Sequence, residues 1–245
     1  MASLDVEWTK NYRIKNGNRP FCFSLAVLDL PSTGSAVDLS QLPFAYTSMY
    51  VEDAGETGEL VTAAAGTVSQ AFEDADLITG HQLCSDLAVL VANRNEAAPA
   101  LDSARTAWAA RREPTDGAPR VIDTRYDAGH LLNGTSRRLV DVCTELNLDV
   151  TQPELRSTSM TNLHRRWLEK DDIEARERVS VLNLRHSLST ALVASAAAGL
   201  GSWDDHGLNV NRMIAAHADG AWGWLQSRTF RDLLGESCPS ETVRS

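Results

Sequence analysis

The order of the secondary structure signals is the feature that most restricts how this chain can fold. Three segments rich in alternating, β-branched or aromatic residues come first, at 3–8, 21–30 and 44–52. A segment with apolar residues at four-residue spacing follows at 58–75, and a short apolar segment at 75–82 then leads into a helical one at 85–94. The order β-β-β-α-β-α predicts an α/β fold in which the three leading strands form an antiparallel meander.

The rest of the chain is predicted to add one strand and then only helices. The strand lies at 119–126, and the helical segments lie at 136–148, 160–199 and 210–234. With this fifth strand we expect a mixed five-stranded sheet flanked by helices. We expect one domain over residues 1–200, with residues 201–245 as a C-terminal helical extension packed on the same domain.

Charge and composition exclude several classes of protein. The 245 residues carry a net charge of −10, which argues against a protein that coats duplex nucleic acid, since that requires many free Lys and Arg. The longest apolar run, 191–200, is too short to cross a membrane, and the acidic N-terminus does not resemble a secretory signal. The four cysteines lack zinc-ligand spacing. We therefore expect a cytoplasmic protein without a membrane partner, and the sequence leaves both a monomer and a homodimer open.

The first candidate motif is Asp5-Val6-Glu7 in the first predicted strand. Residues two apart on a strand point to the same face, so the two carboxylates are expected side by side. Burying them is costly unless a positive charge lies between them, and a hard divalent cation is the usual solution. The alternative is a solvated Asp and Glu on an exposed strand face.

A second candidate motif lies where the fourth predicted strand meets its helix. The segment is Gly80-His81-Gln82-Leu83-Cys84-Ser85-Asp86. An acid at this junction can face the ends of the neighbouring strands, which is a favoured place for sites in α/β sheets. Asp86 is therefore expected close to the Asp5 and Glu7 carboxylates.

Together these motifs resemble the DEDD 3′→5′ exonucleases of the DEDDh type, which include polymerase proofreading subunits and have a ribonuclease H-like fold. That family has Asp-x-Glu on the first strand, a Gly-His-Asn-like turn with an Asp a few residues later, and a His followed five residues later by Asp. The matching residues here are Asp5 and Glu7, then Gly80-His81-Gln82 with Asp86, then His186. The resemblance covers most of residues 3–200. It also implies a structural role for Asp123.

The resemblance implies a metal-dependent exonuclease that acts on single-stranded ends or short oligonucleotides. Two Mg²⁺ or Mn²⁺ ions would lie roughly 4 Å apart. Asp5 would bridge both ions, Glu7 would bind the ion that carries the attacking water, Asp86 would bind the other, and His186 would be the general base. The residues expected to contact substrate are Trp8, His81, Gln82 and Arg185.

The chain departs from the family at the fourth acid. Five residues after His186 comes Ala191, where the family has Asp. Three explanations are open: a degenerate relative that binds nucleic acid or nucleotide without cutting it, a site completed by Glu177 or Asp172, or an inactivating substitution introduced for crystallisation. Residues 29–34 offer a competing first motif. We reject it because Pro31 stands where the Glu belongs and only one clear strand would follow it.

The stretch around the third motif is locally basic within an acidic protein. Its basic residues are Arg156, His164, Arg165, Arg166, Arg176, Arg178 and Arg185. They are expected either to follow the backbone of a single strand or to form a solvated helix face paired with nearby acids. Two other functions stay open beside the exonuclease: a catalytically silent binding module with the nuclease fold, and a phosphoesterase for a small nucleotide-like metabolite.

Overall fold

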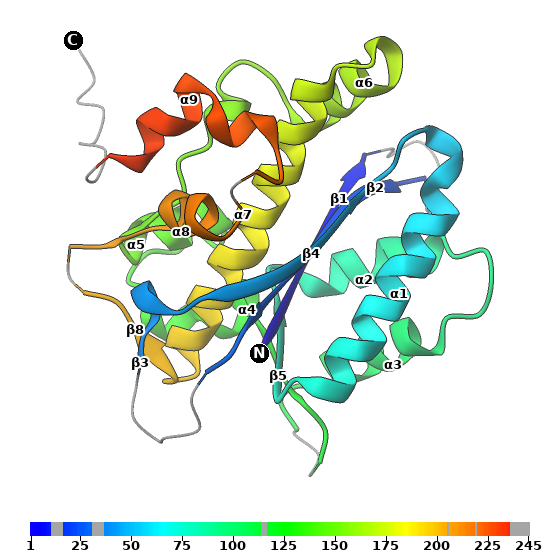
Figure 1. The fold of residues 1–245 in the computed structure, drawn as a ribbon. Helices are drawn as coiled ribbons and strands as arrows, with labels where there is room; N and C mark the ends of the chain where they lie inside the picture. Colours follow the sequence, from blue (N-terminus) through cyan, green and yellow to red (C-terminus); the bar gives the residue numbers. More distant parts are fainter. Residues whose placement is uncertain (11–16, 31–36, 114–116, 205, 219, 236–245) are drawn as a thin grey trace.

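A five-stranded mixed sheet forms the centre of the protein (Figure 1). The computed structural model describes residues 1–10, 17–30, 37–113, 117–204, 206–218 and 220–235. The sheet order is β4-β2-β1-β5-β6, with bounds Phe44–Tyr50, Arg19–Leu28, Ala2–Thr9, Leu77–Gly80 and Arg120–Asp123. Strands β4, β2 and β1 pair antiparallel, while β5 and β6 run parallel to β1. The predicted α/β class, the mixed five-stranded sheet and the leading antiparallel meander are confirmed.

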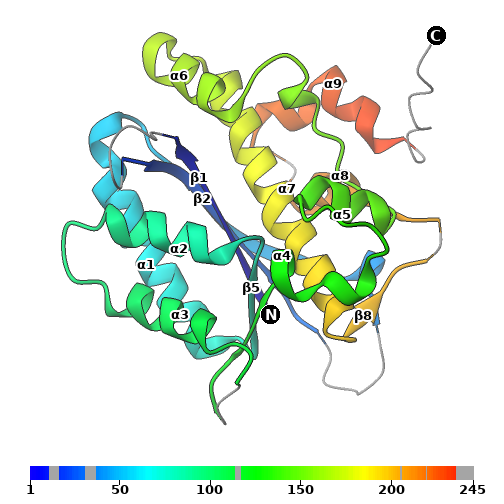
Figure 2. The ribbon, with the colours of Figure 1, turned by 180° about the vertical axis from the view of Figure 1, so that it is seen from behind.

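Helices cover both faces of this sheet (Figures 1 and 2). One face packs against α1 (Thr57–Asp74), α2 (Leu83–Ala92) and α3 (Pro99–Ala109). The other face is crossed by the long helix α7 (Ile173–Ala197). The remaining helices around α7 are α4 (Thr124–Asp127), α5 (Leu139–Glu145), α6 (Met160–Lys170), α8 (Val210–His217) and α9 (Arg228–Arg231). None of the described helices has both the length and the apolar character needed to cross a bilayer.

Short elements connect the helical layer to the rest of the fold. Strand β3 (Val37–Asp38) pairs in parallel with β8 (Gly201–Ser202), and β7 (Leu148–Asp149) pairs in parallel with β9 (Leu208–Asn209). The described 3-10 turns are η1 (Leu39–Gln41), η2 (Ala54–Glu56), η3 (Gly129–Leu131), η4 (Pro153–Leu155), η5 (Gly223–Gln226) and η6 (Asp232–Leu234). These pairings attach the segment after α7 to loops that belong to residues 1–200.

Strand β1 alternates between the two layers, as its sequence requires. Leu4 and Val6 are 2% exposed and pack in the cluster formed with α1, α2 and α3. Asp5 and Glu7 point to the opposite face, towards α7, because side chains alternate along a strand. The polar residues of β1 are thus directed at a buried helix rather than at open solvent.

Helix α7 is the main element over that face. It begins at Ile173, and the preceding Asp172 is its N-cap, since Asp172 Oδ1 accepts a hydrogen bond from the Ala175 backbone N–H at 3.0 Å. Small side chains let it lie close to the sheet: Ser187 Oγ is 3.0 Å from Ser24 Oγ on β2. Helix and sheet are therefore in direct polar contact next to Asp5, which pairs with Ser24.

The C-terminal segment shares its core with α7. Val210, Ile214, Trp224 and Phe230 belong to the same buried cluster as Leu188 of α7. The closing helical hairpin predicted over 210–234 is wrong, because only α8 and α9 form, with 3-10 turns around them. The interruption lies near Gly220, whose positive φ of 80° is readily adopted only by glycine.

Candidate metal site

Three predicted site residues converge between β1 and α7. One ligand atom from each of Asp5, Glu7 and His186 lies within 4.8 Å of the other two. His186 Nδ1 is 3.2 Å from Glu7 Oε1 and 3.6 Å from Asp5 Oδ2. Ligands at ~2.2 Å from one ion are separated by ~3.1 Å when adjacent and ~4.4 Å when opposite. The three side chains therefore could hold one metal ion.

Asp86 reaches the same region from the first turn of α2. It is not part of the 4.8 Å group, but it is 3% exposed, and its Oδ2 has no hydrogen-bond partner among the described residues. Burial, and then the negative charges of Asp5 and Glu7, raise the pKa of Asp86 well above its usual range. A buried acid without a partner is expensive, and a cation bound close to Asp86 would stabilise its charged form.

The imidazole of His186 lies close enough to both acids for their charges to change its pKa. Burial alone would lower the pKa of His186, but hydrogen bonds and charges from Asp5 and Glu7 outweigh it and raise the pKa to about 10. Burial raises the pKa of Glu7, and the His186 hydrogen bond partly opposes that rise. His186 Nε2 lies 3.0 Å from the Gln152 amide nitrogen, so both ring nitrogens have partners.

Asn183 is a site residue that the sequence analysis missed. It is fully buried one turn before His186, and its Nδ2 donates to Asp5 Oδ2 at 2.6 Å and to the Asp5 backbone oxygen at 3.2 Å. Its Oδ1 accepts from the Cys22 thiol at 3.5 Å. Burial, with the nearby Glu7 and Asp5 charges, raises the pKa of Cys22, which keeps the thiol protonated as a donor. A polar amide between Leu182 and Leu184 was the available signal.

The turn after β5 positions α2 but does not present its side chains as predicted. His81 Nδ1 is 2.9 Å from Thr124 Oγ1 and its Nε2 is 2.9 Å from the Arg137 carbonyl oxygen, so neither nitrogen is free for substrate. Gln82 has a positive φ of 67°, and its side chain donates to Ser85. Gly80 is required here because a Cβ would lie 2.9 Å from the Leu83 side chain.

Asp123 at the end of β6 stabilises this turn. Its Oδ1 accepts from the Gln82 backbone N–H at 2.9 Å, and its Oδ2 accepts from Trp108 Nε1 at 2.8 Å. The backbone hydrogen bond holds Gln82 in its left-handed conformation, which a non-glycine residue rarely adopts. The structural role predicted for Asp123 is confirmed.

Arg185 occupies a position that excludes the predicted substrate contact. Its guanidinium is fully buried and makes two 3.0 Å bonds to the Glu154 carboxylate, while its Nε donates to Asn211 Oδ1 at 2.7 Å. A charge can be buried in this way because it is paired in bidentate geometry. Arg185 therefore joins α7 to η4 and α8. Trp8 is partly buried and packs against the cluster around β1 and α1.

The residues proposed around a fourth acid lie elsewhere. Ala191 is fully buried in the apolar cluster with Leu188 and Leu192, so it does not face the carboxylates as predicted. Asp172 caps α7, and Glu177 Oε2 accepts from the Trp224 backbone N–H at 2.8 Å. Neither acid belongs to the Asp5 group, and the idea that one of them completes it is wrong.

The competing first motif receives little support from its position. Asp29 follows directly after β2 and is exposed. Residues 31–34 of that motif lie outside the described residues.

Most of the basic residues near α7 are paired with acids. The ion pairs are Arg166–Asp172, Arg176–Glu52, Arg178–Glu174 and Arg185–Glu154. His164 is buried instead, with its Nδ1 3.0 Å from the Tyr50 hydroxyl. Pairing with acids is thus found for most of the basic stretch, but the Arg185–Glu154 pair is buried and does not belong to a solvated helix face.

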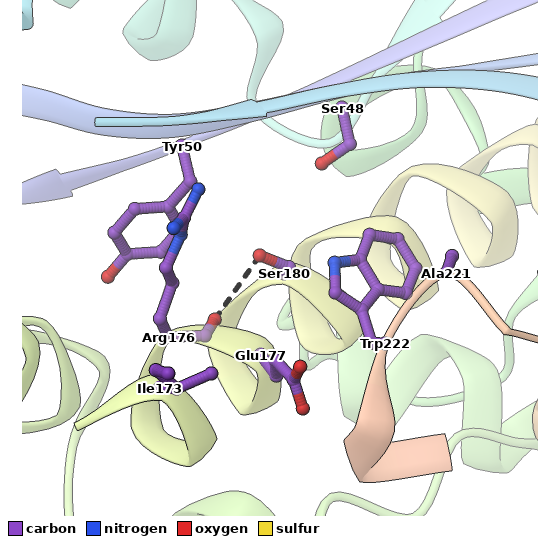
Figure 3. A pocket seen from close by; sticks show the side chains of 8 residues that line it. All are labelled: Ser48, Tyr50, Ile173, Arg176, Glu177, Ser180, Ala221 and Trp222. Carbon is purple, nitrogen blue, oxygen red and sulfur yellow. Dashed lines mark hydrogen bonds between the residues drawn. The ribbon is translucent and has the colours of Figure 1, made fainter. Parts of the chain in front are cut away.

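A separate pocket lies over the edge strand β4 (Figure 3). Its volume is about 270 Å³, and it is lined by Ser48, Tyr50, Ile173, Arg176, Glu177, Ser180, Ala221 and Trp222. The Arg176 guanidinium is engaged with Glu52 at 2.8 Å, and Ser180 Oγ donates to the Arg176 carbonyl oxygen at 3.2 Å. None of the candidate metal ligands lines this pocket, so it is distinct from the metal site.

We infer function from the candidate site alone, because two comparisons with known proteins found no match. No protein-family model matches the chain, and no curated protein matches it.

Proposed function

We propose that this chain is a metal-dependent phosphodiesterase with a ribonuclease H-like fold, acting as a 3′→5′ exonuclease on single-stranded ends or short oligonucleotides. The observation that carries the proposal is the convergence of Asp5, Glu7 and His186 beside a buried Asp86 without a hydrogen-bond partner among the described residues. The sheet order and the antiparallel second strand support the same assignment, because they are compatible with a ribonuclease H-like layout.

The chain's own residues would hold and orient the reacting groups. Asp5, Glu7 and Asp86 supply the negative charge that binds Mg²⁺ or Mn²⁺, and His186 faces the same space through Nδ1. A bound ion of this kind supplies activation of a water and neutralisation of phosphate charge. Because His186 Nδ1 lies within ligand spacing of Asp5 and Glu7, we assign it as a ligand, and its role as general base stays a prediction.

The charge distribution favours a short substrate. A long nucleic acid requires many free cationic groups, whereas four arginines near α7 are engaged with acids. A short oligonucleotide end needs few phosphate contacts beyond the site itself. This supports terminal cleavage of short strands over action along a long polyanion.

The test is hydrolysis of a 3′-terminal single strand. Purified protein with Mn²⁺ should shorten a 5′-labelled oligonucleotide stepwise from its 3′ end, and Asp5→Asn and Glu7→Gln should each reduce the rate by at least about 100-fold. Glu59→Gln is the matched control, because Glu59 is exposed on α1. Absence of cleavage by a folded, Mn²⁺-loaded protein would refute the exonuclease assignment. Faster hydrolysis of a mononucleotide ester would instead indicate a small-molecule phosphoesterase.

A catalytically silent binding module is the second candidate. It is favoured by Asn183, because the α7 side chain in direct contact with Asp5 is a neutral amide that adds no negative charge to the site. Such a module would bind the oligonucleotide in the presence of Mn²⁺ and leave it intact. Fluorescence anisotropy measured alongside the cleavage assay separates the two functions.

A further inference from the structure

We infer that this site binds one divalent cation rather than two, because Asp5, Glu7 and His186 form a single group and the α7 side chain that contacts Asp5 is the amide of Asn183, not a further carboxylate. The inference deepens the proposed function and rests on it for the assignment of Asp5, Glu7 and Asp86 as cation ligands. It concerns the number and kind of ions, which can be measured without any enzymatic activity.

The orientation of the Asn183 amide is fixed by its neighbours. Nδ2 lies 2.6 Å from Asp5 Oδ2 and 3.2 Å from the Asp5 backbone oxygen, and both of these atoms are acceptors. Rotating the amide by half a turn would place Oδ1 against Asp5 Oδ2 and the Asp5 backbone oxygen, and neither of these atoms can donate a hydrogen bond to it. The rotation would also break the contact between Oδ1 and the Cys22 thiol at 3.5 Å. Asn183 therefore offers an N–H at this corner, and an N–H cannot ligate a cation.

Charge balance points to the same stoichiometry. With His186 as a neutral ligand, one divalent cation leaves Asp5, Glu7 and Asp86 with a single net negative charge, which the Asn183 N–H group stabilises through its hydrogen bond to Asp5. A second divalent cation would leave a net positive charge in a site whose ligand side chains are at most 20% exposed. An uncompensated buried charge is strongly unfavourable, so the second ion is expected to bind weakly or not at all.

The donor set also selects the kind of cation. His186 Nδ1 faces Glu7 Oε1 at 3.2 Å, a separation that suits two ligands of one ion. Ligation through Nδ1 requires the proton on Nε2, and the Gln152 amide, whose nitrogen lies 3.0 Å from Nε2, would then have to turn its oxygen towards the ring. Imidazole ligands favour transition metals, whereas Mg²⁺ prefers oxygen ligands, so Mn²⁺ should bind at least about ten-fold more tightly than Mg²⁺.

The first experiment counts ions in the full chain. Protein freed of metal with a chelator is titrated with Mn²⁺ by calorimetry and by electron paramagnetic resonance, with and without a nucleoside 5′-monophosphate. We expect one equivalent and a mononuclear spectrum in both conditions. Two equivalents or a spin-coupled spectrum in the unmodified protein would overturn the inference while leaving the proposed function intact. One equivalent without oligonucleotide cleavage would refute the function and support the inference, and no binding would refute both.

Two pairs of variants test the named residues. Asn183→Asp should admit a second equivalent of Mn²⁺, whereas Asn183→Ser, which removes the amide without adding a charge, should stay at one. His186→Gln should reduce the preference for Mn²⁺ over Mg²⁺ by about ten-fold, and His206→Gln, at an exposed position, should not. A folded Asn183→Asp protein that still binds one ion would show that Asn183 does not set the number. If that variant does not fold, the spectrum of the unmodified protein decides.

Discussion

Replacing Asp86 by Asn should make the metal-free protein more stable. Asp86 is a buried carboxyl group whose Oδ2 has no hydrogen-bond partner in the part of the chain that the structure describes. Asparagine has nearly the same shape but no charge, so Asp86→Asn removes the cost of burying a charge, and then the repulsion from Asp5 and Glu7, which together raise the pKa of Asp86. The residue would then be retained for cation binding at a cost to the stability of the fold.

The size of the effect follows from linkage between proton binding and folding. The unfolded carboxyl group titrates near ~3.9, whereas the folded group keeps its proton to higher pH. A group with a raised pKa contributes stability below the unfolded pKa and loses it as the pH rises, by about 1.4 kcal/mol per pH unit. The variant should therefore exceed wild type by less than about 1 kcal/mol at pH 4.5. Between pH 4.5 and pH 6.5 the difference should grow further, by at most about 1.4 kcal/mol per pH unit.

Urea denaturation followed by tryptophan fluorescence measures this difference. Wild type, Asp86→Asn and the exposed control Glu59→Gln are compared at pH 4.5, 5.5 and 6.5 in chelator, and then with saturating Mn²⁺. The ion should stabilise wild type by about 2.7 kcal/mol at 100 times its Kd and the Asp86 variant by much less. A variant that is no more stable than wild type at pH 6.5, or a difference that does not grow with pH, would refute the reasoning.

Two further predictions concern buried positions outside the metal ligands. Burial lowers the pKa of His164 to about 4. The neutral imidazole therefore contributes fully to the free energy of unfolding above pH 6.5, and this contribution is lost as the pH falls towards 4. The loss in free energy of unfolding should be at most about 3 kcal/mol. His164→Gln, which can still bond to the Tyr50 hydroxyl, should flatten urea-derived stability over this range, and an unchanged slope would contradict the assignment. Ala191→Asp should cost about 3–5 kcal/mol at pH 7, because it buries an unpaired charge among apolar side chains. Ala191→Ser is the control for the steric change. An Ala191→Asp protein of native stability that binds an additional Mn²⁺ ion would show that position 191 faces the metal site.

The sheet and the first two motifs could be predicted because their signals are local. Alternation along β1 fixes which side Asp5 and Glu7 face, and the turn at Gly80 fixes where α2 begins. The order of the strands then brings the C-terminal end of β5 beside β1, which places Asp86 near both acids. These inferences need only periodicity and topology.

The residue that contacts Asp5 beside His186 could not be predicted because burial extends around most of α7. Seventeen of its twenty-five residues are buried, so apolar periodicity does not indicate which side meets the sheet. Counting residues from His186 led to Ala191, whereas packing places Asn183 against Asp5. The substrate contact predicted for Arg185 failed for a related reason. Its partner Glu154 lies 31 residues away, and no local sequence pattern links the two residues.

The contact between β1 and α7 also determines at what stage of synthesis and folding the metal site can form. The Asn183–Asp5 hydrogen bond closes a span of 178 residues, and the His186–Glu7 contact closes one of 179. A ribosome must therefore synthesise residues 1–186 before Asp5 and Glu7 can contact His186, although the β1–β2 hairpin can form much earlier. Nascent chains would display Asp5 and Glu7 without their imidazole partner. Acquisition of a tightly held ion would then mark the completion of folding, and a time course of metal uptake during refolding would report its last step.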